Sequence, residues 1–583
     1  MKALVSTLLA LLILVHGSAH ADMATDFSTL LDEQWEWRLA ASPVRASMLG
    51  DRRYNQEWTD NSLDAIDKRH QEAVEFLRRV YAIEKSALPE SEQLNYELFR
   101  RQLQDDVDAH QFQGYLLPFS HQGGTQSLQN LTNQLRLTTV QDFEDWLARL
   151  GKIDTVIGQE IARAEAGRKA GLTAPRVLME RVQPQIALHV VENAEESPFY
   201  AVFEDLPESI ATEEQERLQS TALEIIDKTV LPAYRKLDRY FSTKYLPACR
   251  ESIGLSALPN GSAWYEYRAR SYTTTRMTPE DIHRLGLDEV KRIREEMMTI
   301  IDEVGFEGSF GEFLTFLRTD PQFYYDDPED LLEAYRATSK RIDPELVKLF
   351  GVLPRMPYGV QPIPDSIAPH TTTAYYSRPA ADGSRAGIYW VNLYKPEVRP
   401  KYEIEVLSVH EAMPGHHLQL ALQQELGEMP MFRRFQGFTA FVEGWGLYSE
   451  RLGYDLGLYL DPYSRFGQLT YDMWRAVRLV VDTGMHYKGW TRQQAIDFFK
   501  DNAAKTEHDI VNEIDRYINW PGQALAYKIG QLRMLTLRER AERRLGDDFD
   551  IRAFHDELLG GGALPLDILE QRMDDWLATY RDE

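Results

Sequence analysis

The sequence predicts a mostly α-helical protein with one small β-sheet. Over most of residues 22–258, apolar residues recur at three- and four-residue spacing between charges, the period of helices with one buried face. Beyond Pro400 the chain returns to long segments of the same kind. Between these regions, segments 371–377 and 387–393 have strand composition, and they flank an Asp-Gly pair within 381–384 that is typical of a tight turn.

The first residues have the pattern of a secretory signal peptide. Lys2 supplies a positive charge, residues 4–15 are almost all apolar, and Ala19-His20-Ala21 is a small-x-small cleavage pattern. The alternative is a short membrane anchor, but about a dozen apolar residues are fewer than the roughly 20 that span a bilayer. No cysteine follows the run, which disfavours a lipid anchor. We expect a signal peptide over 1–21 and a periplasmic or secreted protein without stable membrane insertion.

The composition narrows the classes of function. Hydrophobic residues make up 43% and charged residues 27%, which is ordinary for a globular protein. The formal net charge of −26 repels phosphate backbones, so nucleic acid is disfavoured as a partner. Cys249 is the only cysteine, so neither an internal disulfide nor a cysteine-built metal site is available. The composition does not address the oligomeric state.

Residues 22–262 are expected to form an N-terminal helical region. The helical period predicts helices over four segments: 27–39, 63–83, 143–164 and 213–240. Proline- and glycine-containing stretches separate them. No fixed-period repeat is present.

Residues 263–583 are expected to form a second, catalytic region. Segment 265–274 is aromatic and threonine-rich, which predicts a strand. Thr278 and Pro279 are typical of the N-cap and first position of a helix. The proline-rich segment 354–369 is predicted to be irregular, and it precedes the two strand segments.

The segment His410-Glu411-Ala412-Met413-Pro414-Gly415-His416-His417 carries the densest group of chemically active residues. A zinc hydrolase needs imidazole and carboxylate ligands, an open position for water and a carboxylate base. The usual helical pattern is H-E-x-x-H, with both histidines on one face. Here an amphipathic helix over 401–409 leads into His410-Glu411, but Pro414 stands where the second histidine is expected.

The spacing requires a distortion of the helix. In a regular helix, positions 410 and 417 lie about 10 Å apart, which is too far for one metal. Pro414 must bulge or break the helix, and two extra residues would bring His416 one turn after His410. The alternative is a helix end with incidental histidines. Three of 14 histidines within eight residues, the first followed by glutamate, favour metal ligation, with His416 or His417 as the second ligand.

The third ligand is predicted in the segment 439–450. Glu443 and Glu450 are seven residues apart and share a helix face. Gly444 and Gly446 each cost roughly 1 kcal/mol in a helix, which indicates close contact with a neighbouring helix. The alternative is a pair of solvated carboxylates, but the apolar neighbours make a fully exposed face improbable. We expect Glu443 to be a ligand.

Three motifs resemble the bacterial DUF885 family: 409–419, 441–446 and 520–530. The resemblance covers essentially the whole mature chain and implies a gluzincin-like zinc metallopeptidase of the Peptidase MA clan. It implies a large helical metallopeptidase-like architecture with a small β-sheet beside the active-site helix, similar to the angiotensin-converting-enzyme, oligopeptidase and carboxypeptidase Taq groups.

Within this resemblance, His410 and Glu443 become zinc ligands and Glu411 the general base. The closing Gly-His of the related H-E-x-G-H motif matches Gly415-His416 better than His417. The inserted Met-Pro stretch is the departure from the related pattern, and it keeps His417 open as the alternative second ligand.

Further candidates could assist the reaction. Arg478, Asp482 and His486 recur every four residues along an apolar helix, so His486 or Arg478 could stabilise an oxyanion; the equal alternative is a buried ion pair. Tyr527 is similar in placement to a tyrosine that polarises the carbonyl in related peptidases, or it is a core residue. Gluzincin-type peptidases bind substrate backbone along a strand edge, and by this analogy the strand over 387–392 could line the cleft; the alternative is an ordinary core strand.

These residues predict an exported zinc-dependent hydrolase, and the fold analogy favours short peptides as substrates. Two alternatives stay open: a zinc hydrolase of non-peptide amides or esters, and a non-catalytic periplasmic helical binding protein. A serine hydrolase is disfavoured because the sequence has no G-x-S-x-G motif.

Overall fold

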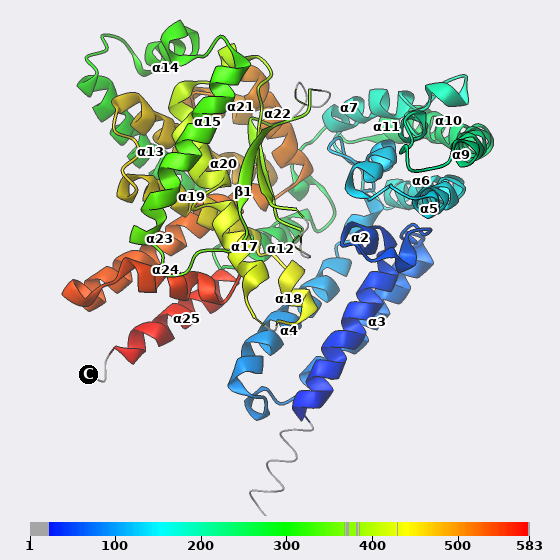
Figure 1. The fold of residues 1–583 in the computed structure, drawn as a ribbon, viewed down its shortest axis with the longest axis horizontal. Helices are drawn as coiled ribbons and strands as arrows, with labels where there is room; N and C mark the ends of the chain where they lie inside the picture. The colour runs from blue at the N-terminus through cyan, green and yellow to red at the C-terminus, as the bar shows by residue number, and fades with distance from the viewer. Residues whose placement is uncertain are drawn as a thin grey trace, which may run out of the picture. The chain divides into compact units, whose positions relative to one another are not determined.

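The computed structural model describes residues 23–365, 368, 372–380, 383, 385–427 and 429–580. The predicted signal peptide therefore lies outside the described residues, as do three of the four residues of the predicted turn over 381–384. The described chain is mostly helical with one three-stranded sheet, which confirms the predicted fold class (Figure 1). No helix among the described residues is long and apolar enough to cross a membrane.

The chain divides into two compact units. The first comprises Met1–Ile253, Leu258–Asn260 and Pro430–Phe432, and the second comprises Gly254–Ala257, Gly261–Met429 and Arg433–Glu583. All predicted site residues belong to the second unit.

The regular elements in the described residues of the first unit are helices, apart from an isolated β-bridge between Pro175 and Arg250. Its helices are residues 23–41, α2 (Pro43–Met48), α3 (Leu63–Tyr81), α4 (Glu90–His110), α5 (Val140–Leu150), α6 (Ile153–Lys169), α7 (Arg176–Ala187), α8 (Ala201–Glu204), α9 (Thr212–Ile225), α10 (Leu231–Tyr240) and α11 (Leu246–Ala248). The predicted helices are present, although that over 143–164 is divided between α5 and α6. Helices α3 and α4 pack side by side as a long pair (Figure 1).

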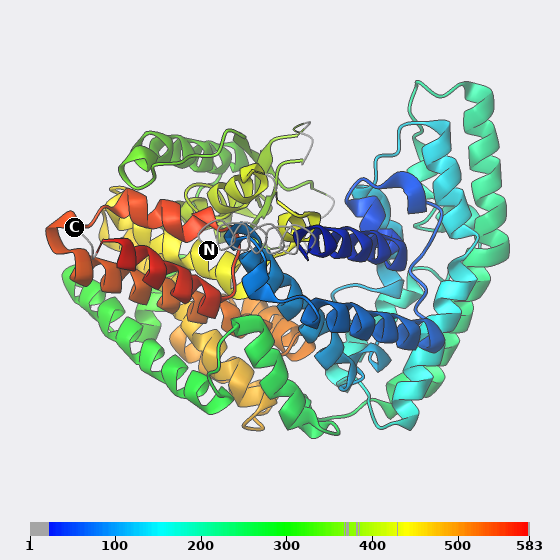
Figure 2. The same cartoon turned by 90° about the horizontal axis from the view of Figure 1, so that it is seen from below.

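The second unit is built around one buried helix. Its helices are α12 (Gly261–Thr273), α13 (Pro279–Glu303), α14 (Phe310–Thr319), α15 (Pro328–Ile342), α16 (Ile404–Glu411), α17 (His416–Glu425), α18 (Met431–Phe435), α19 (Thr439–Asp455), α20 (Pro462–His486), α21 (Arg492–Asn502), α22 (Glu507–Asn519), α23 (Ala526–Leu545), α24 (Ile551–Gly560) and α25 (Leu566–Thr579). Every residue of α20 from Phe466 to His486 is buried except Trp474, as expected for a central helix. Helix α25 packs beside α23 and α24 (Figure 2).

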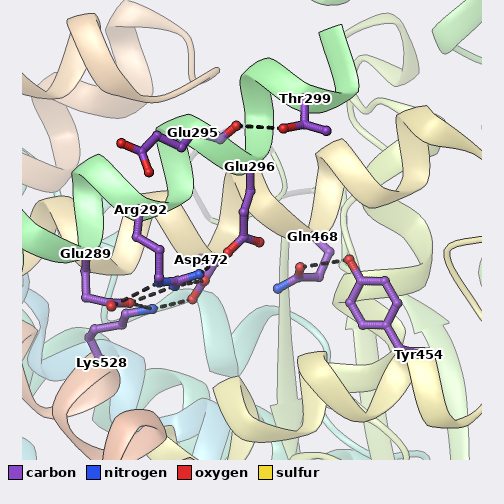
Figure 3. A network of polar contacts seen from close by, with 9 residues as sticks. All are labelled: Glu289, Arg292, Glu295, Glu296, Thr299, Tyr454, Gln468, Asp472 and Lys528. Atoms are coloured by element: carbon purple, nitrogen blue, oxygen red, sulfur yellow. Dashed lines mark hydrogen bonds and ion pairs between the residues drawn. The ribbon is translucent and has the colours of Figure 1, made fainter. Parts of the chain in front are cut away.

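A buried network of charges joins α13, α20 and α23. Lys528 is 1% exposed, and its Nζ lies 2.6 Å from Oδ1 of Asp472 and 2.9 Å from Oε2 of Glu289 (Figure 3). Arg292 donates to the same two carboxylates. Burial would raise the pKa of Asp472, but Lys528 and Arg292 outweigh it and lower this pKa to about 2. The network therefore stays ionised and ties three helices together.

The sheet has the order β1-β3-β2 and lies against α15 and α16 (Figure 1). Strand β3 (Gly387–Val391) pairs with β1 (Tyr358–Pro362) in parallel and with β2 (Ala374–Ser377) in antiparallel orientation. The two predicted strands are confirmed. The prediction that 354–369 is wholly irregular is wrong, because five of its residues form the edge strand β1 and pair with β3. Pro362 is the only proline within β1, and it stands last in this edge strand, where proline is tolerated.

The central position of β3 also corrects a functional prediction. Both sides of β3 are hydrogen-bonded to neighbouring strands, so the strand over 387–392 has no free edge along which substrate backbone could add. The edges of this sheet belong to β1 and β2 instead.

The predicted strand over 265–274 is also wrong, because these residues form most of α12. The buried residues Tyr265, Ala269 and Thr273 are four apart, which is helical spacing. The hydroxyl of Tyr265 donates to Oδ1 of Asp482 at 2.6 Å, so tertiary contacts outweigh the β-propensity of the aromatic residues. The next prediction is confirmed: Thr278 caps α13, which begins at Pro279.

Candidate metal centre

The helix that carries His410 is broken at the proline. Helix α16 ends at Glu411, and α17 begins at His416. Ala412 has φ −100° and ψ −109°, outside the helical region, and the Met413–Pro414 peptide is cis. The predicted interruption is therefore confirmed, and it is a complete break between two helices rather than a bulge within one.

Helix α19 holds this break in place. The indole N–H of Trp445 donates to the carbonyl of Pro414 at 2.8 Å and to that of Gly415 at 3.2 Å, which satisfies carbonyls left over by the break. A Cβ at position 415 would lie 1.9 Å from the carbonyl oxygen of His410, so the turn requires glycine there.

His410, His416 and Glu443 form a compact cluster. Each offers one ligand atom, and these atoms all lie within 4.8 Å of one another. Oε2 of Glu443 lies 3.5 Å from Nε2 of His416 and 4.0 Å from Nε2 of His410. Ligands of tetrahedral zinc are about 3.4 Å apart, given bonds near 2.05 Å. The Glu443–His416 separation already fits. The Glu443–His410 separation would need to close by about 0.6 Å, and the separation of the two histidines by at most about 1.4 Å.

A second carboxylate orients the first histidine. Nδ1 of His410 lies 2.8 Å from Oε1 of Glu450, and both side chains are buried. In its ionised form Glu450 accepts a hydrogen bond from Nδ1–H of His410, which leaves the Nε2 lone pair directed to the cluster. Burial, followed by the positive charges of His416, Arg475 and Arg478, holds the pKa of His410 well below its usual value, and a neutral imidazole is the form that binds metal.

Two glycines of α19 explain how the helices approach so closely. A Cβ at Gly446 would lie 2.8 Å from Cε1 of His410, so the imidazole packs against bare backbone. A Cβ at Gly444 would lie 2.5 Å from the Cα of Gly530 on α23. The predicted close helix contact at these glycines is confirmed.

Glu411 has the electrostatics of a base that works near neutral pH. Burial raises its pKa to about 7, with the negative charge of Glu443 adding to the effect and the charges of His416 and Arg475 opposing it. A carboxylate with such a pKa exchanges protons readily under neutral conditions. Burial also raises the pKa of Glu450, to about 8.

His417 is occupied elsewhere. Its Nδ1 accepts from the hydroxyl of Tyr376 at 2.7 Å, and its Nε2–H donates to the carbonyl of Met356 at 3.0 Å. Both ring nitrogens thus link α17 to the sheet region. Of the two histidines that the sequence left open, the structure brings His416 into the cluster and gives His417 a structural place.

The other predicted residues lie in two neighbouring networks. His486 accepts from the backbone N–H of Leu255 and donates to the carbonyl of Tyr517, both at 3.0 Å, so backbone groups use both of its ring nitrogens. The predicted oxyanion role of His486 is therefore not supported by its contacts. Asp482 accepts from Tyr265 and from the N–H of Gly522, so it forms no ion pair with Arg478.

Arg478 and Tyr527 contact each other. The Arg478 guanidinium lies 4.3 Å from the centre of the Tyr527 ring, and its Nε donates to the hydroxyl of Tyr517 at 2.7 Å. The Tyr527 hydroxyl accepts from Gln523 at 3.4 Å and is half-buried.

Sequence reasoning missed two features of the site. Glu450 was placed on the face of Glu443, but its bond to His410 depends on how α16 and α19 pack. Arg475 was not singled out, although its charge acts on Glu411, Glu443 and Glu450. Its spacing of three residues from Arg478 on one helix was the available signal.

Comparisons with known proteins agree with these motifs. Residues 43–573 match the family described as "Bacterial protein of unknown function (DUF885)". The crystal structure of a "putative lipoprotein" from Colwellia psychrerythraea is similar, with a TM-score of 0.87 and 30% identity over 96% of this chain and 99% of that chain. No curated protein matches this chain.

A second solved structure, a "putative lipoprotein of unknown function" from Shewanella oneidensis, has a TM-score of 0.73 and 19% identity over 95% of this chain and 99% of that chain. At this identity the likeness concerns the fold alone. The family match extends over far more than half of the chain and includes all three ligand candidates. This chain therefore belongs to the DUF885 family.

Proposed function

We propose that this protein is a zinc-dependent hydrolase, and specifically a gluzincin-like metallopeptidase that cleaves short peptides. The observation that carries the proposal is the cluster of His410, His416 and Glu443, whose ligand atoms lie within 4.8 Å of one another. Two imidazoles and one carboxylate are the ligand set of catalytic zinc sites that keep a fourth position for water.

The surroundings of the cluster support a metal site over an incidental group. Glu450 bonds to His410 from behind, as the outer carboxylates of zinc sites do. The side chain of Glu443 is 22% exposed, whereas those of His410 and His416 are 4% and 11% exposed. Glu443 is therefore the most exposed of the three side chains.

The residues around the cluster account for the proton transfers of amide hydrolysis. Zinc, when bound, supplies a Lewis acid that polarises a carbonyl and acidifies water. Glu411 follows His410 directly and has a pKa of about 7, so it can take a proton from the attacking water and return it to the leaving nitrogen.

Export is part of the proposal. The charged start, the apolar run over 4–15 and Ala19-His20-Ala21 support a signal peptide. The similar structures from Colwellia psychrerythraea and Shewanella oneidensis are each described as a "putative lipoprotein", which fits an extracytoplasmic protein.

The experiment is a measurement of metal content and peptidase activity on the purified protein. We expect about one zinc per chain in the wild type, and its loss in His410→Ala and Glu443→Ala. Glu411→Gln should keep the zinc and lose hydrolysis of a library of short peptides by at least about a hundredfold. His508→Ala, which removes an exposed histidine of α22, is the matched control and should change neither quantity.

Either of two results would overturn the proposal. Absence of bound metal after incubation with zinc would remove the basis for metal-assisted chemistry. Zinc binding without hydrolysis of any peptide, amide or ester would instead identify a binding protein with a structural metal.

A further inference from the structure

Arg475 is a buried cation with two unpartnered N–H donors. Its side chain lies on α20, and the residue is 6% exposed. Among the described residues, Nε and Nη1 have no hydrogen-bond partner. The Arg475 guanidinium lies 4.4 Å from the centre of the Trp474 ring and 4.8 Å from the centre of the Tyr471 ring. Ring contacts stabilise the charge only in part, because the N–H donors stay unsatisfied.

Arg478, one turn further along α20, is even more buried and only partly paired. It is 3% exposed, and its Nη1 has no hydrogen-bond partner in the described part of the chain. Its ion-pair partner is Glu513, at 3.2 Å from Nη2. Glu513 also pairs with Arg516 at 3.2 Å, so one carboxylate serves two guanidinium groups. Counted by ion pairs, Arg475, Arg478 and Arg516 have the one carboxylate of Glu513 between them, which is a surplus of positive charge in this corner of the fold.

The surplus lies beside the metal cluster. Helix α20 packs against α16, which carries His410, and against α19, which carries Glu443. The charges of both arginines act on His410 and on Glu443. Trp474 and Tyr527, which contact these guanidinium groups, are half-buried rather than buried, so the corner is not sealed from solvent.

We propose that Arg475 and Arg478 form the binding site for a carboxylate of the substrate. A buried guanidinium without an anion is costly, whereas its planar fork of N–H donors matches a carboxylate. The carboxylate of the substrate then accepts hydrogen bonds from the unpartnered donors, which are Nε and Nη1 of Arg475 and Nη1 of Arg478. The substrate class is a short peptide that bears a free carboxylate close to the scissile bond.

This inference deepens the proposed function and rests on it, so its test uses binding as well as turnover. The probes are N-acetylated trialanine with a free terminal carboxylate, the same peptide as its terminal amide, and an amidated variant whose last residue is glutamate. Calorimetric titration into zinc-loaded Glu411→Gln protein measures affinity without hydrolysis. We expect the free acid to bind about 10- to 100-fold more tightly than the plain amide, the effect of one charged hydrogen-bonded pair.

The arginine variants identify the source of this preference. Adding Arg475→Gln to Glu411→Gln should bring the acid and the amide to equal affinity, with little change for the amide. Arg475→Lys keeps the positive charge but not the planar fork of donors, so it should keep a reduced preference for the free acid. This variant also serves as the control should the glutamine variant misfold. Arg492→Gln, which removes a guanidinium already paired with Asp515, is the matched control and should keep the full preference.

The glutamate amide distinguishes two sources of the carboxylate. If the glutamate amide binds as tightly as the free acid, the site accepts a side-chain carboxylate. If the glutamate amide binds weakly, the site requires the carboxylate of the chain terminus. Equal affinity of acid and both amides for the arginine-containing protein overturns the inference, as does failure of all three peptides to bind. If the wild type hydrolyses library peptides but shows no preference for free acids, this inference alone is overturned. If free acids bind preferentially but the wild type hydrolyses nothing, the proposed function alone is overturned.

Discussion

Nδ1 of His410 lies 2.8 Å from Oε1 of Glu450, so the proposed ligand histidine of α16 is oriented by the same helix that supplies Glu443. Such outer partners fix the tautomer and the angle of a metal-binding imidazole. The arrangement makes α19 responsible for two separate parts of the site, one ligand and the support of another.

Removal of that support should weaken metal binding without removing a ligand. We expect Glu450→Ala to reduce zinc affinity about 10- to 100-fold, because the His410 ring loses its fixed orientation. Competition against a chromophoric chelator measures the change. Glu450→Gln keeps an oxygen acceptor and should lose less; unchanged affinity in the alanine variant would contradict the role of Glu450.

The two adjacent histidines should behave differently. His416→Ala removes a cluster member and should abolish stoichiometric zinc. His417→Ala should keep the zinc but lower stability by about 1–3 kcal/mol, because it leaves the Tyr376 hydroxyl and the Met356 carbonyl without their partner. Metal analysis and urea unfolding separate the two outcomes, and loss of zinc in His417→Ala alone would reverse the assignment.

Gly446→Ala tests the packing of the His410 ring. The added methyl would stand 2.8–3.1 Å from three ring atoms, so the imidazole must move away from the cluster. Zinc affinity should fall at least about tenfold, as for loss of an outer-shell partner. Gly311→Ala in α14 is the control: nothing lies within 4 Å of its added Cβ, and helix propensity should make it neutral or stabilising by about 0.5–1 kcal/mol. Retention of full affinity in Gly446→Ala would show that the ring can shift without cost.

The buried charge network should matter for stability rather than for metal binding. Lys528→Met removes the buried one of the two cations that Asp472 and Glu289 share, leaving Arg292 alone, and we expect a loss of about 3–5 kcal/mol in the free energy of unfolding. Lys500→Met breaks an exposed pair with Glu507 and should cost less than about 1 kcal/mol. Equal effects in denaturant titrations would contradict the network's role.

Asp482 should make stability depend on pH. Burial raises its pKa from 3.8 to about 7, although bonds from Tyr265 and Gly522 oppose the shift. The unfolded chain therefore loses this proton at lower pH than the folded one, and the contribution of Asp482 to stability falls as pH rises from about 4 to about 7.

Asp482→Asn removes this dependence while keeping an oxygen that can accept from Tyr265. We expect the variant to be more stable than the wild type at pH 8, by about 1–3 kcal/mol, and no more stable at pH 5. Urea unfolding at both pH values measures the difference. A stability difference that does not vary with pH would contradict the raised pKa.

Local patterns predicted most helices and the residues of the His410, His416 and Glu443 cluster, because periodicity and the His-Glu pair are properties of short segments. They failed where distant contacts decide. Segment 265–274 looked like a strand, yet the bond from Tyr265 to Asp482 fixes its helix against α20. The choice between His416 and His417 depended on Tyr376 and Met356, and the unpaired state of Arg475 depended on the packing of three helices.

The complete break at residues 412–415 has a consequence for how such sites are found and altered. Because His410 lies in the last turn of one helix and His416 begins another, the number of residues between them is not dictated by the helical turn. Insertions or deletions in the connection can be absorbed while the two imidazoles keep their places. Searches that demand fixed histidine spacing pass over chains of this kind, whereas searches by the three-dimensional arrangement of two imidazoles and a carboxylate will recover them.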